Sequence, residues 1–74
     1  MWEHGSLKVE NQNVSYSMKV FEEPSKYGIN GGRISKLTLK ANKRVIANYD
    51  RGWDIMPTGK LANEALEMIL DARN

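Results

Sequence analysis

The clearest feature of the sequence is a stretch of alternating apolar and polar residues between positions 14 and 20. A repeat of two is expected for a β-strand that buries one face and exposes the other. A shorter run containing Leu7 and Val9 precedes it, and the polar residues 11–13 between the two runs predict a turn. The pattern therefore predicts two paired strands. In the second strand the apolar face is formed by Val14, Tyr16, Met18 and Val20.

Two further strands are predicted after a loop that begins at Pro24. The third covers about residues 33–41 and places Leu37 and Leu39 on one face. Ile34 is out of phase with these leucines, which indicates either a bulge or packing on the other side of the sheet. Residues 42–43 predict a tight turn into a fourth strand. Its apolar face is predicted to be Val45, Ala47 and Tyr49.

The last quarter of the chain has the spacing of an amphipathic α-helix. Pro57 and the candidate N-cap Thr58 precede it, and Met68 and Leu70 widen its apolar arc enough to suggest a further contact such as a dimer partner. Since residues 50–54 break the alternation, an irregular segment is expected before the helix. The predicted fold is a single α+β domain over residues 1–74, a four-stranded antiparallel β-meander with one C-terminal α-helix packed on one face. The apolar stripe consists of Leu61, Ala62, Ala65, Leu66 and Ile69.

Length and composition argue against several classes of function. At 74 residues the chain fits one small domain, and without cysteine it forms no disulfide or cysteine-ligated zinc site. The single histidine, His4, has no neighbouring thiol or carboxylate pair, so we expect no catalytic residues, metal or cofactor and no enzymatic activity. No apolar run approaches the ~20 residues that span a bilayer. The expected location is the cytoplasm.

Charge is unevenly distributed although the formal net charge is only +2. Residues 33–51 contain six basic residues and one acidic residue, Asp50. This bias is consistent with an anionic partner such as nucleic acid. Lysines on the wet face of a sheet also protect strands from aggregation, and that simpler interpretation is favoured.

Two segments, residues 27–33 and 49–54, hold most of the residue types that exceed structural need. If strands three and four form a hairpin, both segments lie at one end of the sheet. Glycine-rich backbone can present N–H groups to an anion, arginine can bind a phosphate or carboxylate, and aromatic rings can stack. The candidate ligand- or partner-binding residues are Tyr27, Asn30, Gly31, Gly32, Arg33, Tyr49, Asp50, Arg51, Trp53 and Asp54.

A purely structural interpretation of these segments is favoured over the binding one. The glycines would shape a turn, the aspartates would pair with Arg33 or Arg51, and Trp53 would fill the core beneath the helix. Gly31-Gly32 lacks the lysine and the Ser/Thr of a P-loop and does not open a helix. No nucleotide-binding fingerprint is therefore present.

Five short blocks of the sequence form a specific pattern: residues 2–5 (WEHG), 19–21 (KVF), 23–25 (EPS), 27–37 (YGINGGRISKL) and 49–54 (YDRGWD). Through these blocks the whole chain resembles a family of short, functionally uncharacterised proteins encoded by phages and prophages of Gram-positive bacteria. The resemblance implies a bacterial cytoplasm during infection or lysogeny. It assigns no activity and no site residues.

These observations lead to one principal hypothesis and two alternatives. The principal hypothesis is a non-enzymatic phage accessory protein that binds a host protein or an anionic small ligand in the bacterial cytoplasm, as an anti-defence or host-takeover factor. Binding would use the two segments named above. The first alternative is a small nucleic-acid-binding domain that uses a basic sheet face and aromatic stacking. The second is a structural phage protein that forms a homo-oligomer through its helix.

Overall fold

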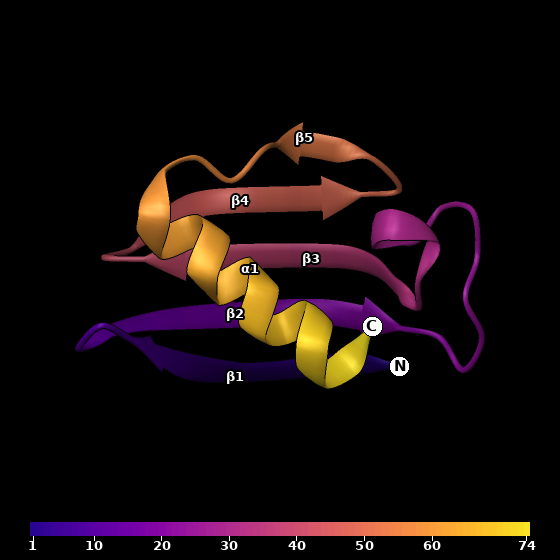
Figure 1. The fold of residues 1–74 in the computed structure, drawn as a ribbon, viewed down its shortest axis with the longest axis horizontal. Coiled ribbons are helices and arrows are strands. Elements are labelled where there is room, and N and C mark those ends of the chain that lie inside the picture. The colour runs from indigo at the N-terminus through magenta and orange to yellow at the C-terminus, as the bar shows by residue number, and fades with distance from the viewer.

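The computed structural model describes residues 1–74 as one antiparallel sheet with a single helix across one of its faces (Figure 1). The strands follow one another in the sheet in chain order. The α+β class and the C-terminal helix are as predicted, but the sheet has five strands, not four. The elements are β1 (Trp2–Val9), β2 (Gln12–Val20), a 3₁₀ turn (Ile29–Gly31), β3 (Ile34–Ala41), β4 (Arg44–Asp50), β5 (Trp53–Ile55) and α1 (Gly59–Arg73).

Two-residue turns connect β1 to β2 and β3 to β4. Glu10 and Asn11 have φ values of 50° and 68°, and Asn42 and Lys43 have values of 52° and 64°. Two consecutive positive φ angles match the turn that suits the right-handed twist of paired strands. The turn predicted at residues 42–43 is confirmed. The first turn comes one residue earlier than predicted, because Gln12 already pairs with Val9.

The side of the sheet that faces α1 is the hydrophobic core. Directly paired residues of neighbouring strands share a face, so the register places the apolar residues of β2, β3 and β4 together under the helix. Ala62, Ala65 and Ile69 are the buried helix residues. Leu70 packs against this core, whereas Met68 is 43% exposed and is the only large apolar side chain that the helix turns outward. The most buried members are Val14, Met18, Ile34, Leu37, Leu39, Ala47 and Ala65.

A β-bulge at Ser35 explains the phase of Ile34. Lys19 pairs with Lys36 and Val20 pairs with Ile34, which leaves Ser35 as an extra residue on β3. The extra residue turns Ile34 to the same face as Leu37, where it is fully buried. The bulge interpretation of Ile34 is therefore confirmed.

A second bulge, at Ile46, makes the predicted apolar face of β4 wrong at one residue. Leu39 pairs with Ala47 and Lys40 pairs with Val45, so Ile46 is the extra residue. Val45 consequently points away from the core and is exposed, while Ile46 packs against the core. A strict repeat of two assigns the opposite faces, because it contains no inserted residue.

The fifth strand replaces the irregular segment predicted before the helix. Arg51 and Gly52 form the turn, with Asp50 donating its backbone N–H to the carbonyl of Gly52 at 2.9 Å. Trp53 then pairs with Tyr49, and their rings meet edge to face at 5.0 Å between centroids. Three residues are too few to show an alternating pattern, so this strand is visible only through its packing.

The helix begins after Thr58, the predicted N-cap, although the Thr58 side chain makes no capping hydrogen bond. Near its end, the Arg73 guanidinium forms an ion pair with Glu3 of β1 at 2.9 Å. Figure 1 shows the helix running diagonally from the β4–β5 side of the sheet to the β1 side. One face of the sheet is therefore covered and the other has no element over it. No helix in the protein has the length and apolar character needed to cross a membrane.

Candidate functional site

The two segments selected from the sequence meet at one end of the sheet. The buried Tyr49 side chain donates its hydroxyl hydrogen bond to the backbone carbonyl of Tyr27 at 2.8 Å. The Arg51 guanidinium lies 5.9 Å from the centre of the Tyr27 ring, and its backbone N–H donates to the carbonyl of Ser35. Tyr27 itself is half exposed and also has the Lys26 ammonium over its ring at 5.2 Å.

The glycine loop uses its backbone N–H groups within the fold. Gly31 donates to the carbonyl of Gly28 at 3.0 Å, and Gly32 donates to that of Ile29 at 2.9 Å. Asn30 and Gly31 adopt positive φ angles of 53° and 70° to make this turn. Because both glycine N–H groups are already bonded, they do not form the anion-binding concavity that the sequence suggested.

The side chain of Asn74 fixes the loop from the other end of the chain. Its amide nitrogen donates to the carbonyl of Ile29 at 2.9 Å, and its amide oxygen accepts from the N–H of Ile34 at 3.1 Å. A side chain on Gly32 would overlap the Asn74 amide, which explains the glycine at that position. Arg33 is also engaged here, since it donates to the carbonyl of Arg73 at 2.8 Å. This half of the predicted site is thus largely structural.

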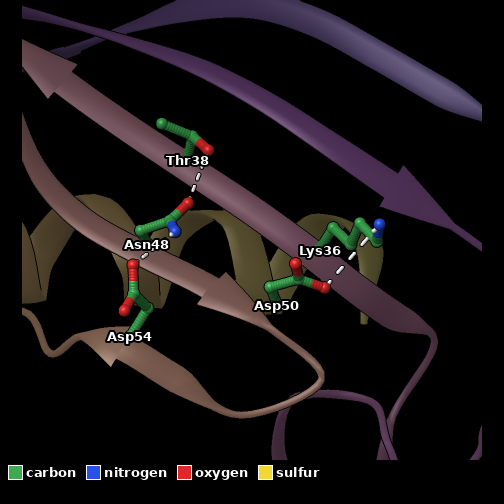
Figure 2. A network of polar contacts seen from close by, with 5 residues as sticks. All are labelled: Lys36, Thr38, Asn48, Asp50 and Asp54. Atoms are coloured by element: carbon green, nitrogen blue, oxygen red, sulfur yellow. Dashed lines mark hydrogen bonds and ion pairs between the residues drawn. The ribbon is translucent and has the colours of Figure 1, made fainter.

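The second segment contributes to a shallow polar depression on the uncovered side of β4 and β5. The depression has a volume of about 500 Å³. Asp50 pairs with Lys36 at 3.7 Å, and Asp54 accepts a hydrogen bond from Asn48, which in turn accepts one from Thr38 at 2.8 Å (Figure 2). Trp53 also lines the depression, but its half-buried ring lies on the covered side of the sheet, where it contacts Tyr49 and packs against the core. The lining residues are Asn48, Asp50, Gly52, Trp53 and Asp54.

This depression is lined mainly by acidic and polar side chains. It offers two carboxylates and an amide beside one another, and no cluster of three or more potential metal-ligating side chains occurs in the protein. Of the ten predicted residues, Tyr27, Asp50, Arg51, Trp53 and Asp54 present side chains at this end of the sheet. Tyr49 lies beneath them in the core.

The uncovered face carries a second group of residues, which are far apart in the sequence and were not predicted to lie together. The register turns one lysine of β1, one of β2 and two of β3 to this face, and these three strands place no acidic residue on it. The small hydroxyl residues Ser15, Ser17 and Thr38 lie between the lysines. Alternation within β2 and β3 already marked a wet face, but only the register shows that the charges form one surface. The lysines are Lys8, Lys19, Lys36 and Lys40.

Aromatic side chains occupy one corner of the same face. Trp2 pairs with Lys19, so it shares the uncovered side, and it is 51% exposed. The His4 ring lies nearly parallel to that of Trp2, with 6.3 Å between centroids and 10° between planes. Phe21 is 45% exposed and has the Lys19 ammonium 5.2 Å from its ring centre. The periodic pattern does not predict this corner, because the three rings come from two separate stretches of the chain.

A second depression lies at the opposite end of the face, beside the two-residue turns. It has a volume of about 420 Å³ and contains lysine, serine and asparagine side chains but no acidic or apolar residue. Lysine ammonium groups and hydroxyls are both donors to anionic oxygens. The lining residues are Ser6, Asn13, Ser15, Lys40, Asn42 and Lys43.

A pair of carboxylates lies away from both depressions, where the first turn meets the helix. A hydrogen bond with Glu10 raises the pKa of Glu64 above its ordinary value of 4.5, helped by partial burial and by the negative charge of Glu10. Lys60 opposes this shift and contacts both carboxylates, at 3.4 Å to Glu10 and 3.9 Å to Glu64. This cluster links the β1–β2 turn to α1.

Comparison with known proteins gives a family but no activity. The chain belongs to the family described as domain of unknown function (DUF7678), whose model matches residues 1–74. No curated protein and no solved structure matches the chain.

Proposed function

We propose that the protein is a non-enzymatic binding protein that holds nucleic acid on the uncovered face of its sheet. The observation that supports this proposal is the composition of the face. Strands β1 to β3 place four lysines and no acidic residue on it, and exposed aromatic rings adjoin the lysines. Cations that neutralise phosphates supply most of the affinity of sequence-independent binding, and rings add stacking with bases.

The architecture leaves this face available. The helix buries the apolar side of the sheet. The other side carries polar residues, which can face solvent without a further element over them. Lys36 is the only one of the four lysines that forms an ion pair, and its contact with Asp50 is long and exposed. An exposed pair of this kind contributes little to stability, so its exchange for a phosphate contact costs little. The cations of the face are therefore ready to bind an anionic partner.

The test is binding of a mixed-sequence oligonucleotide at low ionic strength, followed as salt is raised. We expect measurable binding that weakens steeply with salt. A double variant Lys36→Ala/Lys40→Ala should reduce the slope of log K against log salt by roughly 0.7 to 0.9 for each phosphate that is no longer neutralised. Lys60→Ala is a matched control, because Lys60 lies on the helix and contacts Glu10. Absence of binding to both DNA and RNA at low salt would refute the proposal.

A second candidate function is docking of a host protein at the end of the sheet selected from the sequence. A specific observation favours it: Tyr27 and Arg51 are exposed, and Trp53 is half-buried beside a depression. Tyrosine, tryptophan and arginine are the residue types that most often dominate binding energy at protein interfaces. Capture of a protein partner by the wild type and its loss with Arg51→Ala, while Lys40→Ala retains it, would support this site over the lysine face.

The biological setting of either function is proposed from the sequence resemblance alone. A phage accessory protein in the bacterial cytoplasm would encounter both nucleic acid and host proteins. An anti-defence or host-takeover role is compatible with each. Identification of the captured molecule from infected cells, after mild cross-linking, distinguishes a nucleic-acid ligand from a protein partner and from a bound anionic small molecule.

A further inference from the structure

We infer that the ligand of the uncovered face is a single-stranded nucleic acid, with bases stacked at the aromatic corner of Trp2, His4 and Phe21 and a backbone phosphate in the lysine-hydroxyl depression beside the two turns. This inference rests on the proposed function and adds to it the strandedness of the ligand and its placement. Two features of the same face carry it, one apolar and aromatic and one cationic, and they lie at opposite ends.

The aromatic corner is suited to free bases. Trp2 and Phe21 are exposed to about half of their full extent, so both rings are accessible to a stacking partner. The rings of Trp2 and His4 are within 10° of parallel, so bases stacked on them would also lie parallel to each other. Bases in a duplex are already stacked within the helix and do not reach such rings, whereas single strands expose them.

The corner is held firmly in place. Val20 donates its backbone N–H to the carbonyl of Met1 at 2.8 Å, so the strand pairing of β1 with β2 extends past Trp2. Lys19 pairs with Trp2 across the strands and places its ammonium over Phe21. A cation beside exposed rings can bind a phosphate while bases stack on the rings, and single-strand binding proteins combine these two kinds of contact.

The depression beside the turns is suited to the phosphate backbone. Its lining contains Lys40 and Lys43 with the hydroxyls of Ser6 and Ser15, and it has no carboxylate to repel an anion. The other depression, with Asp50 and Asp54, has the opposite electrostatic character and would repel phosphate. Charge complementarity therefore directs an anionic strand to the end of the face that holds the turns.

The spacing between the two features fits a strand of several nucleotides. Trp2 and Ser6 are four residues apart on β1, a distance of about 13 Å, and two strand spacings from β1 to β3 add about 10 Å across the sheet. Ser17 and Thr38 lie in the middle row between them and present hydroxyls. The face has no protruding helix or ribbon that would enter the groove of a duplex.

The decisive experiment compares a twelve-nucleotide oligothymidylate with a twelve-base-pair duplex, using residues 1–74 at fixed low salt. We expect the single strand to bind at least tenfold more tightly. Trp2→Ala and, independently, Phe21→Ala should each weaken single-strand binding by about tenfold and leave duplex binding unchanged, since a stacked base contributes roughly 1–3 kcal/mol. Circular dichroism establishes that each variant is folded.

Tryptophan fluorescence provides a second readout, because the protein has two tryptophans at opposite edges of the sheet. In Trp53→Phe the remaining Trp2 should be quenched by the oligonucleotide, and in Trp2→Phe the remaining Trp53 should not. Lys40→Ala/Lys43→Ala should weaken binding without removing the quenching at saturation.

The outcomes separate the inference from the proposed function. Equal affinity for single strand and duplex, with lysine variants weakened and Trp2→Ala unaffected, would overturn the single-strand inference and leave nucleic-acid binding in place. No binding of either oligonucleotide at low salt would overturn both.

Discussion

The two faces of the sheet are formed by alternate residues of the same strands and differ in almost every property. On the covered face Leu37 and Leu39 are 1% and 0% exposed and pack beneath α1. On the other face Lys36, Thr38 and Lys40, from the same strand, contact solvent and carry charge or hydroxyl groups. Alternate residues of each strand therefore serve different purposes: those on the covered face stabilise the fold, and those on the other face are free for the proposed binding. Single substitutions can test one property without the other.

The largest effect is expected from a truncation on the covered face. Leu39→Ala should lower the free energy of unfolding by about 2–5 kcal/mol, because it leaves a cavity in the centre of the core. Lys40→Ala, at the adjacent residue, should change it by less than about 0.5 kcal/mol. Urea denaturation of both variants measures the contrast. Similar losses for the two would mean that the uncovered face also contributes packing.

A smaller loss of stability is expected when the Asn74 side chain, which holds the loop before β3 in place, is removed. Asn74→Ala removes the partners of the Ile34 N–H and the Ile29 carbonyl, which should cost about 1–3 kcal/mol. Asn63→Ala is the control, since the Asn63 bond to the Gly59 carbonyl is exposed. Hydrogen exchange should increase at the Ile34 amide in the first variant only. Unchanged protection there would show that the loop closes without Asn74.

A gain in stability is expected from a substitution at Ser35, the extra residue of the β3 bulge. The Ser35 hydroxyl is buried and has no hydrogen-bond partner. Ser35→Ala removes that unpaired group and should raise the free energy of unfolding by about 0.5–1 kcal/mol. Ser15→Ala, on the open part of β2, should be neutral. A loss of stability in Ser35→Ala would indicate that the hydroxyl has a partner in solution.

The smallest effect concerns pH. Since the folded protein holds the pKa of Glu64 above 4.5, the contribution of this group to stability is complete at lower pH and is lost as the pH rises through the raised value. Glu10→Gln removes the neighbouring carboxyl group and should flatten this dependence. Asp71→Asn leaves the pair intact and should retain it. Thermal unfolding between pH 3 and 7 gives the comparison, and identical profiles for wild type and Glu10→Gln would exclude the interaction.

Most of the architecture followed from residue periodicity, and the exceptions have a common cause. The strands β2 and β3 and the helix were predicted because each has a full set of apolar residues at a regular spacing. The face of Val45 was missed because Ile46 is an inserted residue, and β5 was missed because it has only three residues. Bulges and short strands are determined by packing against neighbours, which a single periodic pattern does not contain.

The candidate site could be predicted only where topology alone determined it. The hairpin of β3 and β4 was sufficient to bring Tyr27 and Arg51 together. The contact of the Asn74 side chain with the glycine loop could not be predicted, since nothing near Gly32 in the sequence indicates that residue 74 packs there. The corner of Trp2 and Phe21 required the register of β1 against β2. The sequence therefore indicates which residue types each segment offers, but not which residues from distant parts of the chain contact them.

The chain-ordered meander has a kinetic consequence. Every strand is hydrogen-bonded only to its neighbours along the chain, so the sheet can grow by successive hairpins and needs no distant strand to be found. Docking of the helix, which joins Arg73 to Glu3, closes the longest loop and should be the late step. Substitutions beneath the helix are then expected to accelerate unfolding more than they slow folding.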